Sequence, residues 1–117
     1  MRSALYLFVS LLAVTVAHGE ELRCDISKKY VCESDGCKSV PAAVWNLVDS
    51  VSGSYSRCDS RGCDRLQAQL SQSGVFINID VPGHGLIAKM TADASSFHEI
   101  ATLEHIIYIS FGSCRRN

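Results

Sequence analysis

Residues 75–90, VFINIDVPGHGLIAKM, contain the pattern that decides the expected fold. In the first part of this stretch every second residue is aliphatic and would share one face of a strand: Val75, Ile77, Ile79 and Val81. Phe76, Asn78 and Asp80 fall on the opposite face. The turn residues 82–85 (PGHG) lead into a second alternating run, in which Leu86, Ala88 and Met90 share a face. Two alternating runs joined by a Pro/Gly turn are typical of an antiparallel hairpin.

The same strand pattern continues on both sides of this hairpin. Residues 97–103 and 106–111 are rich in β-branched and aromatic side chains, and residues 66–70 alternate cleanly with period two. Residues 54–58 and 30–32 are weaker strand candidates. Residues 41–51 (PAAVWNLVDSV) fit helical spacing as well as alternation, and we favour a strand because of their β-branched and aromatic content. The sequence predicts an all-β, small antiparallel meander of about six to eight strands that closes into a barrel or sandwich.

Six cysteines predict a disulfide-stapled domain. They are Cys24, Cys32, Cys37, Cys58, Cys63 and Cys114. Residues 32–37 (CESDGC) and 58–63 (CDSRGC) repeat one pattern, Cys-acid-Ser-x-Gly-Cys, in which a four-residue turn places its two cysteines opposite each other. We therefore expect these two local bridges, and a third between Cys24 and Cys114, although other pairings stay open. The alternative is a four-thiolate zinc site made by the two pairs.

Residues 1–19 have the organisation of a cleaved secretory signal, expected to be helical before cleavage. Arg2 precedes an apolar run from residue 4 to 17, and Ala17 and Gly19 are the small residues before a cut after position 19. The run is too short for a spanning helix, which needs about 20 apolar residues. We expect a signal peptide at 1–19, a single β domain at 20–117, a secreted or periplasmic location, and no membrane attachment after cleavage.

The remaining features argue against several classes of function. The net charge is −1 and no basic patch with aromatics occurs, so nucleic-acid binding is not expected. Phosphate-binding and hydrolase motifs are absent, and the carboxylates Asp59, Asp64, Asp80, Asp93 and Glu99 are scattered. His84, His98 and His105 lack metal-ligand spacing, although His84, His98 and Asp80 could form a metal site if hairpins brought them together. We therefore expect no enzyme, no cofactor, no metal, and no catalytic residue.

A loop of small residues before the second Cys-x4-Cys turn is the candidate binding surface. Small side chains allow close approach, and Tyr and Arg are enriched at binding hot spots. The candidate residues are Ser52, Gly53, Tyr55, Arg57 and Arg61. We predict a non-catalytic protein-binding or inhibitor-type module that recognises another exported or extracellular protein. The alternatives are a core role for Tyr55, a small barrel that carries an apolar ligand, and an exported hydrolase. The sequence does not specify an oligomeric state.

The layout is similar to that of periplasmic lysozyme inhibitors of the small β-barrel type. They are short exported chains with an early and a late cysteine and a Ser-Gly-x-x-Tyr loop. Here the corresponding residues Ser52-Gly53-Ser54-Tyr55 are one residue shorter, and the second, Lys-Gly-containing loop of that family is not found. The similarity covers general layout and one motif, so we do not assign the chain to the family.

Overall fold

The computed structural model describes residues 21–117, and the expected signal peptide lies outside them. Within that range the regular structure is entirely β, and every strand pairing is antiparallel. The strands are β1 (Glu21–Glu33), β2 (Gly36–Val40), β3 (Trp45–Asp49), β4 (Ser54–Asp59), β5 (Gly62–Gln67), β6 (Gln69–Ser73), β7 (Phe76–Val81), β8 (Leu86–Thr91), β9 (Phe97–Leu103) and β10 (Ile106–Arg116). The predicted all-β meander is confirmed, with ten strands in the described chain instead of six to eight.

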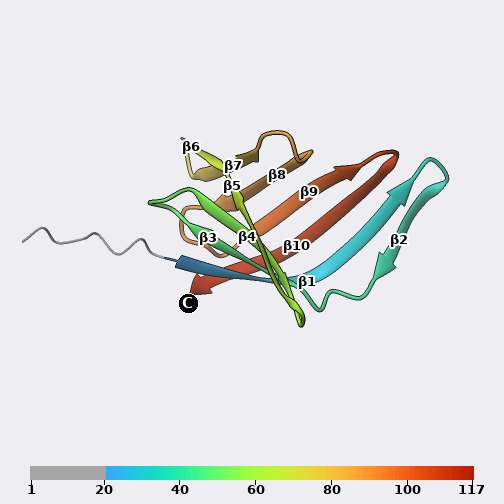
Figure 1. The fold of residues 1–117 in the computed structure, drawn as a ribbon, viewed down its shortest axis with the longest axis horizontal. Helices are drawn as coiled ribbons and strands as arrows, with labels where there is room; N and C mark the ends of the chain where they lie inside the picture. The colour runs from blue at the N-terminus through green and yellow to red at the C-terminus, as the bar shows by residue number, and fades with distance from the viewer. Residues whose placement is uncertain (1–20) are drawn as a thin grey trace, which may run out of the picture.

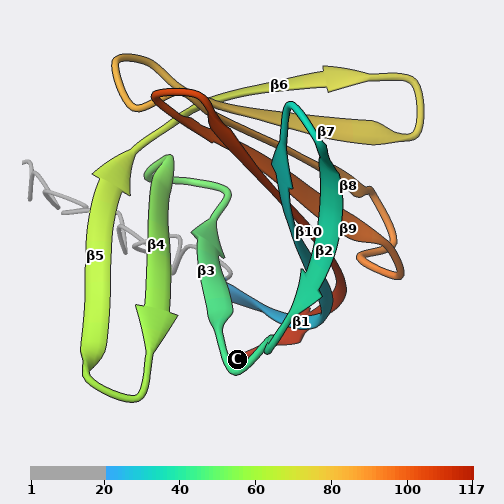
Figure 2. The same cartoon turned by 90° about the vertical axis from the view of Figure 1, so that its right-hand side faces the viewer.

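One sheet contains all of these strands and curls into a nearly closed barrel (Figures 1 and 2). Its order is β5-β4-β3-β1-β10-β9-β8-β7-β6, with β2 paired to β1 beside this path. The two ends of the path, β5 and β6, follow each other in the chain and are joined at Ala68. The amide of Ala68 donates to the carbonyl of Gly53, 2.8 Å away, which fixes the corner where the chain turns from one side of the barrel to the other.

Strand β1 is long enough to hold three neighbours. Residues 21–25 pair with β3, residues 29–33 pair with β2, and β10 runs along the opposite edge. The register with β10 shifts between Ile26 and Lys28, which is a bulge, and Gly112 pairs with Ile26 at that point. A Cβ atom on Gly112 would lie 2.0 Å from the Asp25 carbonyl oxygen, so the close approach of the two backbones requires glycine.

The core lies on the inner face of the curled sheet. The hairpin of β7 and β8 supplies Ile79, Val81, Leu86, Ala88 and Met90, all buried as the alternation predicts. Val75 is an exception: it is 64% exposed, because β7 begins one residue later, at Phe76. The other large, fully buried side chains among the described residues come from several strands and are Cys24, Val48, Tyr55 and Phe97.

The segments that were hardest to interpret from sequence have clear physical explanations. Residues 45–49 form β3, so the strand assignment is confirmed for that part of residues 41–51. The alternation at 66–70 spans the end of β5 and the start of β6. The chain changes direction at Ala68, but buried and exposed side chains continue to alternate through this corner. The weak signal at 30–32 is the end of β1, which begins at Glu21.

All six cysteines form the expected bridges, Cys24–Cys114, Cys32–Cys37 and Cys58–Cys63. The described residues contain no free cysteine, so the zinc alternative is wrong. The two local bridges close the β1–β2 and β4–β5 hairpins, and the third joins neighbouring residues of β1 and β10. Three disulfides are compatible with an oxidising compartment. No helix in the described part of the chain is long and apolar enough to cross a membrane.

Candidate functional site

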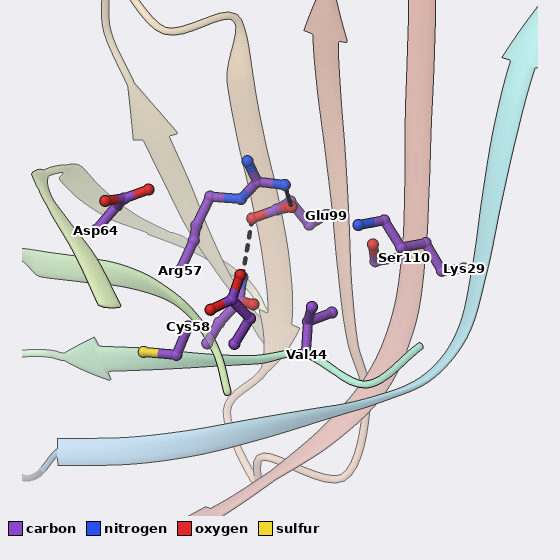
Figure 3. A pocket seen from close by; sticks show the side chains of 9 residues that line it. Lys29, Val44, Arg57, Cys58, Asp64, Glu99 and Ser110 are labelled. Carbon is purple, nitrogen blue, oxygen red and sulfur yellow. Dashed lines mark hydrogen bonds and ion pairs between the residues drawn. The ribbon is translucent and has the colours of Figure 1, made fainter. Parts of the chain in front are cut away.

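A row of polar side chains crosses the otherwise apolar inner face. Lys29 of β1 pairs with Ser110 of β10, and Ser110 pairs with Glu99 of β9. Because paired residues of adjacent strands point to the same face about 4.8 Å apart, the three form one line about 10 Å long. Ser110 lies in the middle, as Figure 3 shows.

A second polar row comes from the other side of the barrel. Asn46 of β3 pairs with Arg57 of β4, and Arg57 pairs with Asp64 of β5. The curl of the sheet turns this row towards the first one (Figure 3). A cavity of about 170 Å³ lies between the rows. Its remaining lining residues are Val44, Cys58 and Asp59.

Glu99 is the centre of the buried hydrogen-bond network at this cavity. It is 2% exposed. Its Oε2 accepts hydrogen bonds from the Asn46 Nδ2, 2.8 Å away, and from the Tyr55 hydroxyl. Its Oε1 accepts one from the Arg57 guanidinium at 3.1 Å, which also balances the carboxylate charge. A buried carboxylate needs both a counter-charge and hydrogen bonds, and Glu99 has both.

Tyr55 is held in the neutral form by this environment. Burial, and then the nearby charge of Glu99, raise the pKa of Tyr55 well above its usual value of 10.0. The Asn46 amide also donates to the Tyr55 oxygen, so the hydroxyl is both donor and acceptor. The three side chains Asn46, Tyr55 and Glu99 therefore hold one another in a fixed arrangement beside the cavity.

Lys29 is the cation of the cavity that lacks a carboxylate partner. Burial and the charge of Arg57 lower the pKa of Lys29, and Glu99 opposes that effect. Its ammonium lies 5.3 Å from the centre of the Tyr108 ring, within the range of a cation–π contact. Among the described residues no carboxylate oxygen lies within 4.0 Å of Lys29.

Ser110 is the other polar group of this wall whose side chain has no hydrogen-bond partner among the described residues. It is 3% exposed, it lines the cavity, and its hydroxyl makes no hydrogen bond to any residue of the described chain. A hydroxyl of this kind beside an unpaired ammonium makes this wall of the cavity a place for a group that accepts hydrogen bonds.

The structure separates the residues that the sequence suggested as a binding surface. Ser52 and Gly53 lie in the β3–β4 turn, whereas Arg61 lies in the β4–β5 turn at the other end of β4. Tyr55 is 0% exposed and packs in the core, which is the alternative considered for it. Arg57 lines the cavity. Of the five, Arg57 and Arg61 alone line a common surface pocket, on the β4–β5 hairpin.

Sequence reasoning missed most of the polar network. Glu99 was counted as one of several scattered carboxylates, and Lys29, Asn46 and Ser110 were not singled out. One signal was available: Glu99 lies between Phe97 and Ala101 in the alternation, which places a charged residue on the buried face. Charged residues are almost never fully buried unless they are paired, so this position identifies a site in which a partner is required.

The histidines do not form a metal site. His84 and His105 are exposed residues in turns, and His98 lies on the outer face, with its ring centre 6.4 Å from that of Phe111. His98 and Asp80 line a shallow outer groove that does not include His84. No group of three His, Cys, Asp or Glu side chains within residues 21–117 is arranged to hold a metal ion, so the alternative built on these residues is not supported.

Comparison with known proteins identifies no relative of this chain. No family model, curated protein or solved structure matches it. The similarity of residues 52–55 to the lysozyme-inhibitor loop stays a similarity of layout, and with Tyr55 buried it carries no argument for a binding surface.

Proposed function

We propose that the chain is a secreted or periplasmic, non-catalytic protein-binding module of inhibitor type, and that its partner binds at the mouth of the polar cavity. The observation that carries this proposal is the pair of facing polar rows around a cavity that is open to solvent. Within residues 21–117 the Lys29 ammonium and the Ser110 hydroxyl of this cavity have no polar partner. A site of this kind is suited to receiving a polar group from outside.

The position of the cavity supports a protein partner. Cys58, Asp59 and Asp64 line it, and all three belong to the β4–β5 hairpin, whose tip is closed by the Cys58–Cys63 bridge. Arg61 is exposed at the same tip. Binding costs less entropy when the contacting elements are already rigid. The disulfide-closed tip therefore provides a preorganised edge against which a protein surface can dock.

The lining chemistry favours this function over an apolar-ligand carrier. Seven of the nine lining residues are charged or polar: Lys29, Asn46, Arg57, Asp59, Asp64, Glu99 and Ser110. An apolar ligand would remove water from these groups without replacing its hydrogen bonds, which is unfavourable. The interior beyond the polar rows is filled by the apolar core, including Ile79, Met90 and Phe97.

The arrangement of Glu99 also supports a non-catalytic role. Both of its carboxylate oxygens already accept hydrogen bonds from the protein, and Arg57 balances its charge. A general acid or base needs a free oxygen within reach of its substrate. In this geometry Glu99 fixes the position of Arg57.

Affinity capture from the extracellular or periplasmic fraction of the source organism tests the proposal. The bait is the mature domain, and the variants are Arg61→Ala and Asp64→Ala at the proposed surface, with Ser52→Ala at the opposite end of β4 as the matched control. We expect saturable capture of a protein by the wild type and the control, and a loss of about tenfold or more in affinity for at least one surface variant. Failure to capture any protein saturably, or loss confined to Ser52→Ala, would contradict the proposal.

A further inference from the structure

The inner wall of the cavity carries one cation, Lys29, that makes no ion pair with a described residue. Arg57 and Glu99 form an ion pair at 3.1 Å and neutralise each other. Lys29, half-buried on the opposite side, contacts the face of Tyr108 and makes no ion pair with the described residues. Asp59 and Asp64 are exposed residues on the β4–β5 hairpin, and Asp64 lies on the far side of Arg57 from Lys29 (Figure 3). The inner wall therefore attracts an anion.

Hydrogen-bond donors converge on the same space. Ser110 is 3% exposed, its hydroxyl makes no hydrogen bond with a described residue, and it lines the cavity next to Lys29 across the β1–β10 pair. Arg57 carries five N–H donors in a planar fork, and its only hydrogen bond to a described residue is donated by Nη2. Lys29, Ser110 and Arg57 thus offer hydrogen-bond donors from three strands to one acceptor group in the cavity.

The lining residues also limit which anion fits. Glu99, Asp59 and Asp64 all line the cavity, so a doubly charged phosphate would meet three carboxylates with only two cations. A monoanion meets less repulsion than a dianion from these carboxylates, and Lys29 is the lining cation that makes no ion pair with a described residue. The volume of about 170 Å³ corresponds to about six water molecules, which is enough for a carboxylate on a short aliphatic stem.

We propose that this cavity binds a single carboxylate group, held by Lys29, Ser110 and Arg57, and that an acidic side chain of the protein partner supplies it. The identity of the donor as a protein rests on the proposed function. The carboxylate specificity rests on the cavity alone. The two statements can therefore fail separately.

Acetate is the probe for the site itself. Backbone amide shifts of the intact, oxidised domain are followed by NMR during titration with sodium acetate at constant ionic strength, with sodium phosphate and sodium chloride in parallel. We expect saturable shifts centred on Lys29 and Ser110 with acetate, and weaker or unsaturable shifts with phosphate and chloride. No saturation with acetate, or tighter binding of phosphate, would overturn the proposal.

Matched variants connect the shifts to the named donors. Lys29→Gln removes the ammonium, and its control is Lys28→Gln, because Lys28 is the preceding residue of β1 and is exposed. Ser110→Ala removes the hydroxyl and keeps every charge, and its control is Ser113→Ala at an exposed position. We expect acetate affinity to fall about tenfold or more in Lys29→Gln, by a smaller factor in Ser110→Ala, and not in the controls. Equal losses in Lys29→Gln and Lys28→Gln would mean non-specific attraction and would overturn the site.

Competition separates the two sources of the carboxylate. If acetate, but not chloride at equal ionic strength, displaces the captured protein, the partner supplies the group. If acetate binds the cavity without displacing the protein, or no protein is captured at all, the ligand is a free carboxylic acid and the protein source is overturned.

Discussion

Replacement of Tyr55 by phenylalanine isolates the contribution of the buried network to stability. Phenylalanine fills nearly the same volume, so the 0% exposed ring keeps its packing. The change removes the hydroxyl that donates to Glu99 and accepts from Asn46. Glu99 keeps its bonds to Asn46 and Arg57, so its charge stays compensated.

The expected loss follows from the kind of bond that is broken. A hydrogen bond to a charged group contributes about 1.5–3 kcal/mol, and the second bond to the Tyr55 oxygen places the loss towards the upper part of that range. We therefore expect Tyr55→Phe to lower the free energy of unfolding by about 2–3 kcal/mol. For a domain of roughly 100 residues, this corresponds to a fall in Tm of about 10 °C or more.

Tyr108→Phe is the matched control. Tyr108 also lies on the inner side of the sheet and contacts the core and Lys29, but its hydroxyl makes no hydrogen bond with a described residue. Its replacement should change the free energy of unfolding by less than about 0.5 kcal/mol. Urea unfolding with the disulfides intact, followed by circular dichroism, measures both variants, and equal m-values confirm that the comparison is between like states. Equal losses in the two variants would refute the role assigned to the Tyr55 hydroxyl.

Three further predictions concern pH, the disulfides and the bulge. Above pH 10 the unfolded chain releases the Tyr55 proton while the folded domain keeps it, so the free energy of unfolding should fall as pH rises. The fall should be smaller in Tyr55→Phe, and chemical denaturation at a series of pH values measures it. Loss of the Cys24–Cys114 bridge, which spans a sequence separation of 90, should destabilise the domain by about 4–5 kcal/mol. Loss of Cys58–Cys63, with a separation of 5, should cost about 2 kcal/mol, because a shorter loop restricts the unfolded chain less. Thermal unfolding of the two double-alanine variants measures both losses, and the reverse order would contradict this prediction. Gly112→Ala should cost roughly 3 kcal/mol, because its Cβ would lie 2.0 Å from the Asp25 carbonyl oxygen, and an unchanged urea midpoint would show that the two strands can separate there without loss.

Local pattern predicted the parts of this fold that depend on neighbours in the chain. The β7–β8 hairpin was predictable because its alternation and its turn agree, and burial of Ile79 and Ala88 follows from them. The two short bridges were predictable for the same reason, since a four-residue turn fixes which cysteines face each other. These features need no information about distant strands.

The bulge in β1 explains why most of that strand was missed. Cys24 and Ile26 point inward, and after the register shift the residues of the same face are Lys29 and Val31. The inward positions therefore change from even to odd numbers within one strand. A period-two pattern cannot continue through such a change, so β1 was recognised only at its end.

The candidate site depends on pairing between strands that are far apart in sequence. Lys29, Glu99 and Ser110 become neighbours only through the β1–β10–β9 register, and no local rule specifies that order. Arg57 was selected from sequence as an exposed anchor, whereas in the folded domain it is the cation that balances Glu99. Sequence could identify Glu99 as unusual for a buried face, but not which residues surround it.

The Cys24–Cys114 bridge has a consequence for circular permutation. It joins residues whose Cα atoms are 3.9 Å apart, and the Asn117 amide donates to the Glu21 carbonyl nearby. A short peptide could therefore link residue 117 to residue 21, with new termini placed in the exposed 82–85 turn. In that rearranged chain the same two cysteines would close a loop of roughly ten residues instead of 90, so the bridge would keep its geometry and lose about 2 kcal/mol of its stabilising effect. The stabilisation that this disulfide provides therefore depends on the order in which the strands are connected along the chain.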